Sequence, residues 1–171
     1  MSTTVGPKSL RHSVFSFPNP VNEISARLVA GMVVALTLTT IMAGQWWLYA
    51  FLFYGFLARV ATGPTLSPIG LLATRVLVPL LGNPSRPVPG PPKRFAQSVG
   101  FVFSGAALVL YVVMDAPVAA NGVLAVLAVF AALESFVGFC AGCFTFNQLM
   151  RLGLIPQSVC EECRVALEPS S

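Results

Sequence analysis

Four long apolar segments, separated by short polar turns and one proline-rich loop, dominate the pattern of this chain. An α-helix rises about 1.5 Å per residue, so roughly 20 apolar residues cross the ~30 Å hydrocarbon core of a bilayer. The pattern therefore predicts an all-α membrane protein with four transmembrane helices. The expected spans are residues 24–43, 45–60, 95–114 and 118–143.

The loop between the second and third spans, residues 61–94, is rich in proline. Within it, Ser67-Pro68 resembles a helix cap followed by a first-turn proline, and Pro79 interrupts the apolar run that follows. We therefore expect a short helix over residues 68–81. At about 14 residues it is too short to span, which is typical of an interfacial or re-entrant segment.

Two tails flank the membrane domain of residues 21–150. Residues 1–20 are polar and punctuated by proline, which predicts a flexible N-terminal tail. No signal-peptide core precedes Val21, so we expect the first span to act as its own insertion signal, beginning near a cap at Asn22. Residues 151–171 form a polar C-terminal tail.

The distribution of positive charge predicts how the spans are oriented. All ten lysines and arginines lie near the two tails or the central loop, whereas the turns at 44–45 and 115–117 contain none. By the positive-inside rule, we expect a multi-pass protein of the cell membrane with both termini and the long loop in the cytoplasm.

The overall composition supports a lipid environment and gives no sign of nucleic-acid binding. The 171 residues are 56% hydrophobic and only 9% charged, whereas soluble proteins carry about 25% charged residues. The net charge of +4 comes from residues that flank apolar segments rather than from a basic face. No phosphate-binding glycine loop or Ser/His/Asp set is present.

The candidate chemistry lies in four cysteines near the C-terminus, arranged as two Cys-x-x-Cys pairs: Cys140, Cys143, Cys160 and Cys163. The cytoplasm is reducing, so stable structural disulfides are not expected there. The spacing between the pairs fits a tetrahedral Cys₄ zinc site, and it also fits thiol–disulfide or sulfur exchange. Simple packing of small side chains is a further alternative.

Local electrostatics treat the two pairs differently. Cys160 follows Ser158 in a capping-box pattern, so the helix dipole there favours a thiolate, although Glu161 and Glu162 oppose it. Cys140 and Cys143 are expected near the C-terminal end of the fourth span. A helix dipole disfavours a thiolate at that end unless the helix continues or an arginine lies nearby.

Glu134 is the one acidic residue deep inside an apolar run, six positions before Cys140. A carboxylate at this depth is costly unless it is neutral or paired with a cation. Arg59 and Arg94 are the candidate partners, because both are expected at the same membrane face. Glu134 is therefore either part of a structural ion pair or a proton acceptor beside the thiols.

The sequence Gly-Phe-Cys-Ala-Gly-Cys at 138–143 resembles a feature of the bacterial DUF4395 membrane proteins. The resemblance covers roughly residues 20–150. Its other elements are Gly-Gln-Trp-Trp at 44–47, Arg59, Gly63-Pro64, Ser67-Pro68, Pro-Lys-Arg-Phe-Ala at 92–96 and Leu133-Glu134.

The resemblance implies the membrane architecture and marks the first cysteine pair as the site. The family is sometimes linked to thioredoxin-like and sulfurtransferase proteins, which implies thiol or sulfur chemistry with a cytosolic partner of that kind. In the family an acidic residue often stands one turn before the arginine that matches Arg59. Gly55 occupies that position in this chain.

Three functional hypotheses follow from the sequence. The first is a membrane thiol or sulfur-handling protein in which Cys140 and Cys143 exchange with Cys160 and Cys163. The second is a non-enzymatic membrane module in which the four cysteines bind structural zinc. The third is a small permease subunit in which Glu134 lines the transport path.

Overall fold

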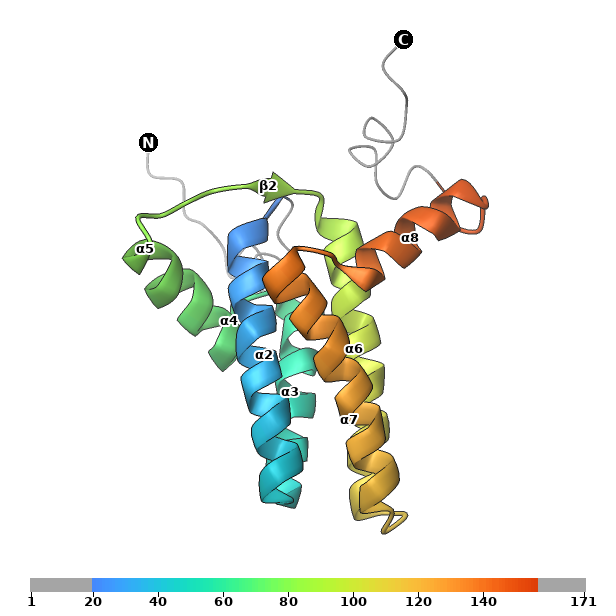
Figure 1. Ribbon diagram of the computed structural model, residues 1–171. Coiled ribbons are helices and arrows are strands. Elements are labelled where there is room, and N and C mark those ends of the chain that lie inside the picture. The colour runs from blue at the N-terminus through green and yellow to red at the C-terminus, as the bar shows by residue number, and fades with distance from the viewer. Residues whose placement is uncertain (1–19, 157–171) are drawn as a thin grey trace, which may run out of the picture.

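The computed structural model describes residues 20–156, and its centre is a bundle of helices that run up and down beside one another (Figure 1). The four long helices are α2 (Glu23–Ala43), α3 (Trp46–Thr62), α6 (Gly90–Val112) and α7 (Pro117–Ala132). Helix α7 continues without interruption into a π-helical turn, η2 (Leu133–Val137). The fold class is therefore all-α, as the sequence predicts.

Three of these helical segments, α2, α6 and the continuous α7–η2, are long and apolar enough to cross a membrane. Helix α3 has 17 residues, which corresponds to about 26 Å at 1.5 Å per residue. It extends past Arg59 to Thr62, beyond the predicted end of this span at residue 60. The structure thus establishes three candidate spans, and α3 packs alongside α6 in the same bundle.

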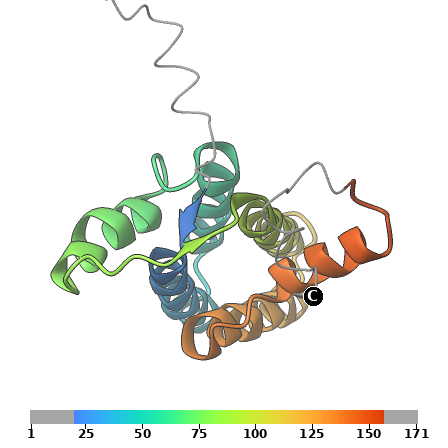
Figure 2. The ribbon, with the colours of Figure 1, turned by 90° about the horizontal axis from the view of Figure 1, so that it is seen from above.

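Asn22 caps the N-terminus of α2, the first helix of the bundle, as the sequence predicts. Its side-chain oxygen accepts from the backbone N–H of Ile24 at 3.1 Å and of Arg86 at 3.2 Å. Its amide donates to the Pro84 carbonyl at 2.9 Å. These bonds accompany a short antiparallel ladder between β1 (Val21–Asn22) and β2 (Pro87–Val88), which crosses the end of the bundle (Figure 2). The sequence pattern does not predict this ladder.

At the opposite end, aromatic side chains connect the two helical hairpins. The Tyr111 hydroxyl donates to the Gly44 carbonyl in the α2–α3 turn, where Gly44 adopts φ 59°. The Tyr49 ring stacks on Tyr111 with ring centroids 4.3 Å apart, and its hydroxyl lies 2.6 Å from the Asn121 side-chain oxygen. The two hairpins are therefore joined where the chain carries no lysine or arginine.

The proline-rich loop contains the expected short helix, formed by three consecutive segments from Pro68 to Leu80. It projects to one side of the bundle (Figures 1 and 2). Ser67 accepts from the Gly70 N–H at 3.3 Å and begins the helix. A proline lacks an N–H and crowds the preceding turn, which accounts for the π-helical turn just before Pro79. The segments are α4 (Pro68–Leu72), η1 (Ala73–Leu77) and α5 (Val78–Leu80).

The boundaries of the last two predicted spans differ from the structure. Helix α6 begins at Gly90 rather than residue 95, because prolines in the first turn need no N–H partner and are suited to start a helix. The expected span 118–143 is wrong at its C-terminal end, since the helix stops at Val137. Gly138 adopts φ 78°, and the Phe139 N–H bonds back to the Leu133 carbonyl at 3.1 Å. This left-handed glycine reverses the chain.

A separate helix, α8 (Ala141–Arg151), follows this break and packs across the start of α6 (Figure 1). The contact depends on a small residue, because a Cβ at Gly142 would lie 2.6 Å from the Ala96 backbone. Phe146 is buried on α6 with its ring centroid 5.7 Å from that of Phe95. Close backbone approach and one aromatic pair therefore fix α8 to the bundle.

Substituting Gly142→Ala should displace α8 and lower the free energy of unfolding by about 1–3 kcal/mol, as overpacking typically does. Faster alkylation of the cysteines in detergent would report the displacement, and a lower thermal midpoint would report the stability. The matched control is Gly122→Ala on α7, where an added Cβ meets nothing within 4 Å. Equal behaviour of the two variants would show that the contact is not needed.

Candidate functional site

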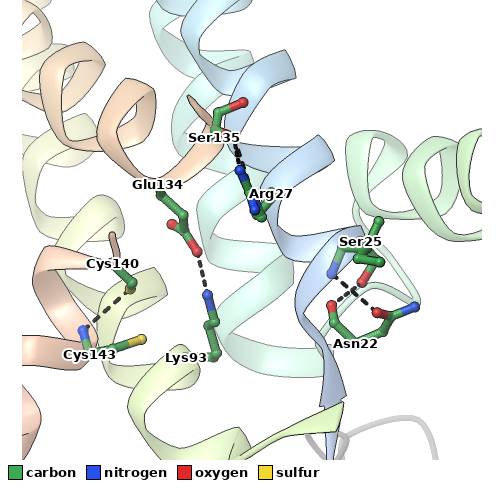
Figure 3. Close-up of polar contacts among 9 residues, drawn as sticks. Asn22, Ser25, Arg27, Lys93, Glu134, Ser135, Cys140 and Cys143 are labelled. Atoms are coloured by element: carbon green, nitrogen blue, oxygen red, sulfur yellow. Dashed lines mark hydrogen bonds and ion pairs between the residues drawn. The ribbon is translucent and has the colours of Figure 1, made fainter. Parts of the chain in front are cut away.

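The first cysteine pair lies at the break between η2 and α8, beside an ion pair from α6 and η2 (Figure 3). Cys140 is the N-cap of α8, and its sulfur accepts a hydrogen bond from the Cys143 backbone N–H at 3.3 Å. Lys93 Nζ lies 2.6 Å from Glu134 Oε1. The structure thus places Cys140, Cys143 and Glu134, three of the residues singled out in the sequence, at the same end of the bundle, and adds Lys93.

The helix break reverses the electrostatic expectation for this pair. With the span ending at residue 143, the thiols would face the negative end of a helix dipole. Because α8 begins instead at Ala141, Cys140 and Cys143 occupy the cap and first turn of a helix. The exposed N–H groups at such an end favour the thiolate over the thiol.

The two sulfurs differ in proton affinity. The pKa of Cys140 is lowered, chiefly because the Cys143 side chain donates a hydrogen bond to its sulfur. The Lys93 ammonium and the Cys143 backbone N–H act in the same direction, against burial and the charge of Glu134. The same hydrogen bond, together with burial, raises the pKa of Cys143. The pair therefore consists of a thiolate-prone Cys140 and a Cys143 that retains its proton.

The Lys93–Glu134 ion pair is nearly withdrawn from solvent, with side chains 10% and 15% exposed. We expected Arg59 or Arg94 to be the partner of Glu134, and the structure assigns this position to the neighbouring Lys93. Arg59 instead donates to Gln97 at 2.9 Å and to Ser67 at 3.2 Å. The sequence pattern did not indicate Lys93, because the predicted third span begins at residue 95 and leaves Lys93 in the loop, whereas α6 begins at Gly90.

Arg27 on α2, a residue that the apolar pattern does not mark as part of the site, binds the end of η2. Its guanidinium donates from Nε and Nη2 to the Ser135 carbonyl and from Nη2 to the Phe136 carbonyl, all at 3.2 Å (Figure 3). These carbonyls lie at the C-terminal end of a helix, where no following turn supplies backbone N–H donors. Arg27 therefore fixes the position from which the chain turns towards Cys140.

Glu134 lies in the π-helical turn itself, and such turns occur frequently at functional sites. The adjoining cavity measures ≈ 440 Å³ and is lined by both cysteines and Lys93. Asn147, one turn along α8, also lines it, and its side-chain oxygen is buried with no hydrogen-bond partner among residues 20–156. The thiols thus face a space that holds a cation and an unused acceptor.

The second pair, Cys160 and Cys163, lies outside the described residues, so exchange between the pairs stays a prediction. Within residues 20–156, no cluster of three or more histidine, cysteine or acidic side chains is suited to hold a metal ion. A Cys₄ zinc site would therefore need the tail pair as well.

The features above define a class: an all-helical protein with apolar, membrane-length helices and a Cys-x-x-Cys pair beside a buried ion pair at one end of the bundle. A protein-family model described as "Domain of unknown function (DUF4395)" matches residues 21–151. The chain belongs to this family, as its resemblance to the DUF4395 proteins predicts. No curated protein and no solved structure matches it.

Alkylation rates should reveal the asymmetry of the two thiols. Only the thiolate reacts, so a lowered pKa gives Cys140 a reactivity midpoint below the ordinary thiol value of 9.0. The rate of iodoacetamide labelling should rise to a plateau as pH increases through that midpoint, while Cys143 stays unreactive. The measurement uses a variant with serines at positions 160 and 163.

The control for this experiment is Cys143→Ala, which removes the hydrogen bond to the Cys140 sulfur. Its midpoint should move to higher pH, because the thiolate loses its strongest stabilising contact. A Cys140 midpoint at or above 9.0 in the protein with both thiols would contradict the assignment.

Proposed function

We propose that this chain is a membrane thiol–disulfide or sulfur-exchange protein whose nucleophile is Cys140 and whose resolving thiol is Cys143. The observation that carries the proposal is the position of Cys140 at the start of α8. There its sulfur accepts the Cys143 N–H and its pKa is lowered. Low-pKa cysteines in Cys-x-x-Cys motifs at helix N-termini are the usual nucleophiles of such exchange.

The exchange begins when the Cys140 thiolate attacks a disulfide sulfur of a partner protein. A mixed disulfide forms, the partner's own disulfide breaks, and its second sulfur leaves as a thiolate that takes up a proton. Cys143 then loses its proton and attacks the Cys140 sulfur, which releases the reduced partner. The pair ends as a disulfide, and two electrons have passed to the partner.

The ion pair suits the second step, in which Cys143 must give up a strongly held proton. The Lys93 ammonium interacts electrostatically with both thiols, and Glu134 accepts its hydrogen bond. A cation that faces both sulfurs stabilises whichever one carries the charge. We infer that Glu134 fixes Lys93 in this position and offers a proton acceptor next to it.

Restoring the dithiol requires two electrons from a second dithiol. We propose the tail pair, Cys160 and Cys163, as this relay, with a cytosolic thioredoxin-like or sulfurtransferase protein as the external partner.

The membrane topology that suits this role has four spans, of which α3 is the shortest, and places both termini in the cytoplasm. It is supported by the described basic residues, all of which lie away from the two turns that close α2–α3 and α6–α7.

Replacing the resolving thiol should trap the intermediate. Cys143→Ser leaves Cys140 able to attack but unable to be released, so a covalent adduct with the partner should accumulate and should disappear on reduction. Non-reducing electrophoresis with mass spectrometry would detect it. Cys140→Ser is the matched control and should give no adduct. An adduct of equal yield in both variants would contradict the roles, and near-stoichiometric protein-bound zinc would favour the metal-binding alternative.

The proposed orientation predicts which thiols an impermeant maleimide reaches from outside intact cells. With the native cysteines replaced by serine, Asp115→Cys in the α6–α7 turn should be labelled. Gly153→Cys, just after α8, should be labelled only after the membrane is opened. The opposite pattern would show that the orientation is inverted, and labelling of both from outside would show that α7 does not cross the membrane.

A further inference from the structure

Among residues 20–156, the hydrogen-bond partners of a second buried cation, Arg59, are all neutral. Arg59 lies on α3 and is 4% exposed. Its Nε donates to the Gln97 side-chain oxygen at 2.9 Å, its Nη1 to the Ser67 hydroxyl at 3.2 Å, and the guanidinium carbon lies 4.3 Å from the Phe56 ring centroid. The remaining nitrogen, Nη2, is buried and has no hydrogen-bond partner among residues 20–156.

The acidic residues of the described chain do not supply Arg59 with its own counter-ion. Glu134 is the near carboxylate, and it forms the ion pair with Lys93. Glu23 lines the thiol cavity, and Asp115 lies in the turn at the opposite end of the bundle. Two buried cations therefore share one carboxylate. A buried charge and an unmade hydrogen bond are each costly.

Arg59 lines a cavity of ≈ 200 Å³ between the start of α2, the end of α3, the loop helix and the start of α6. Most of its walls are apolar, including Val21, Val29 and Pro64. Gln97 also lines it: its amide oxygen accepts from Arg59, and its amide nitrogen donates no hydrogen bond within the described part of the chain. The walls of the cavity therefore include a buried guanidinium with one unused N–H group, a second donor in Gln97 and an excess of positive charge.

We propose that this cavity is a binding site for a small oxyanion group, such as phosphate, sulfate or carboxylate, held against Arg59. A guanidinium presents planar, rigid donors that match oxyanion geometry, and burial strengthens the interaction. One bound negative charge would balance the second cation and satisfy Nη2. The source is either a free ion or the headgroup of an anionic lipid. The site goes beyond the proposed thiol chemistry and does not depend on it.

The chain offers a sharp test at Gly55, one turn before Arg59 on α3. A Cβ at this position would lie 3.5 Å from Arg59 Nη1, an ordinary contact distance. Gly55→Asp therefore places a carboxylate within reach of the guanidinium and supplies an internal counter-ion. Gly55→Ala adds the same carbon without charge and is the matched control.

The first arm titrates phosphate, sulfate and acetate separately into the full-length protein in neutral detergent, with chloride as the background salt, by calorimetry. The unaltered protein and Gly55→Ala should bind one equivalent of at least one of these ions. Gly55→Asp should bind it at least tenfold more weakly, as should Arg59→Gln. Because Arg59→Gln removes a buried group and is at risk of misfolding, the Gly55 pair carries the test.

The second arm uses nanodiscs of phosphatidylcholine with and without phosphatidylglycerol, and native mass spectrometry of retained lipid. Retention of phosphatidylglycerol by Gly55→Ala but not by Gly55→Asp would identify a lipid headgroup as the source. Equal behaviour of the two Gly55 variants in both arms would overturn the proposal. Cys140→Ser should bind the anion normally, so failure of the thiol chemistry and failure of this site are distinguishable.

Discussion

A carboxylate and an ammonium group, both almost withdrawn from water, meet at 2.6 Å where α6 faces the π-helical end of α7. Neither charge is tolerable alone at such a site, and breaking a buried pair typically costs about 3–5 kcal/mol. The ion pair therefore fixes which face of the first turns of α6 points towards η2, and it fixes the position of η2 along the axis of α6. The α8 contact with Ala96 begins one turn further along α6, so the dithiol depends on the same register.

The second determinant of the site is the abrupt end of η2. Arg27 binds the last carbonyls of that helix, and Gly138 turns the chain through a left-handed conformation. Three unrelated segments thereby converge on one short stretch: the first helix, the start of α6 and the Cys-x-x-Cys element. None of the three is adjacent in sequence to the others. The position of the cysteines is thus set by contacts that span most of the bundle.

The apolar pattern predicted the helices well, because segment length and hydrophobicity depend on local sequence. The cap at Asn22 and the helix that follows Ser67 were also predicted correctly, because helix capping depends on local sequence too. Two features needed tertiary information. The stop at Gly138 lies in an uninterrupted apolar run, and hydrophobicity alone does not distinguish continuation from a left-handed turn. Lys93 was missed because prolines 91 and 92 suggested a linker, although both fit the first turn of α6.

The cysteine that begins α8 is both a helix cap and the proposed nucleophile of the site. Its sulfur accepts the Cys143 N–H best as a thiolate, so any bond formed at that sulfur removes part of what holds the first turn of α8. Under the proposed exchange, helix stability and reduction potential are therefore linked: packing of α8 on α6 that favours the reduced pair makes the disulfide a stronger oxidant. The same exchange would then alter how α8 packs at the end of the bundle each time its cysteines gain or lose electrons.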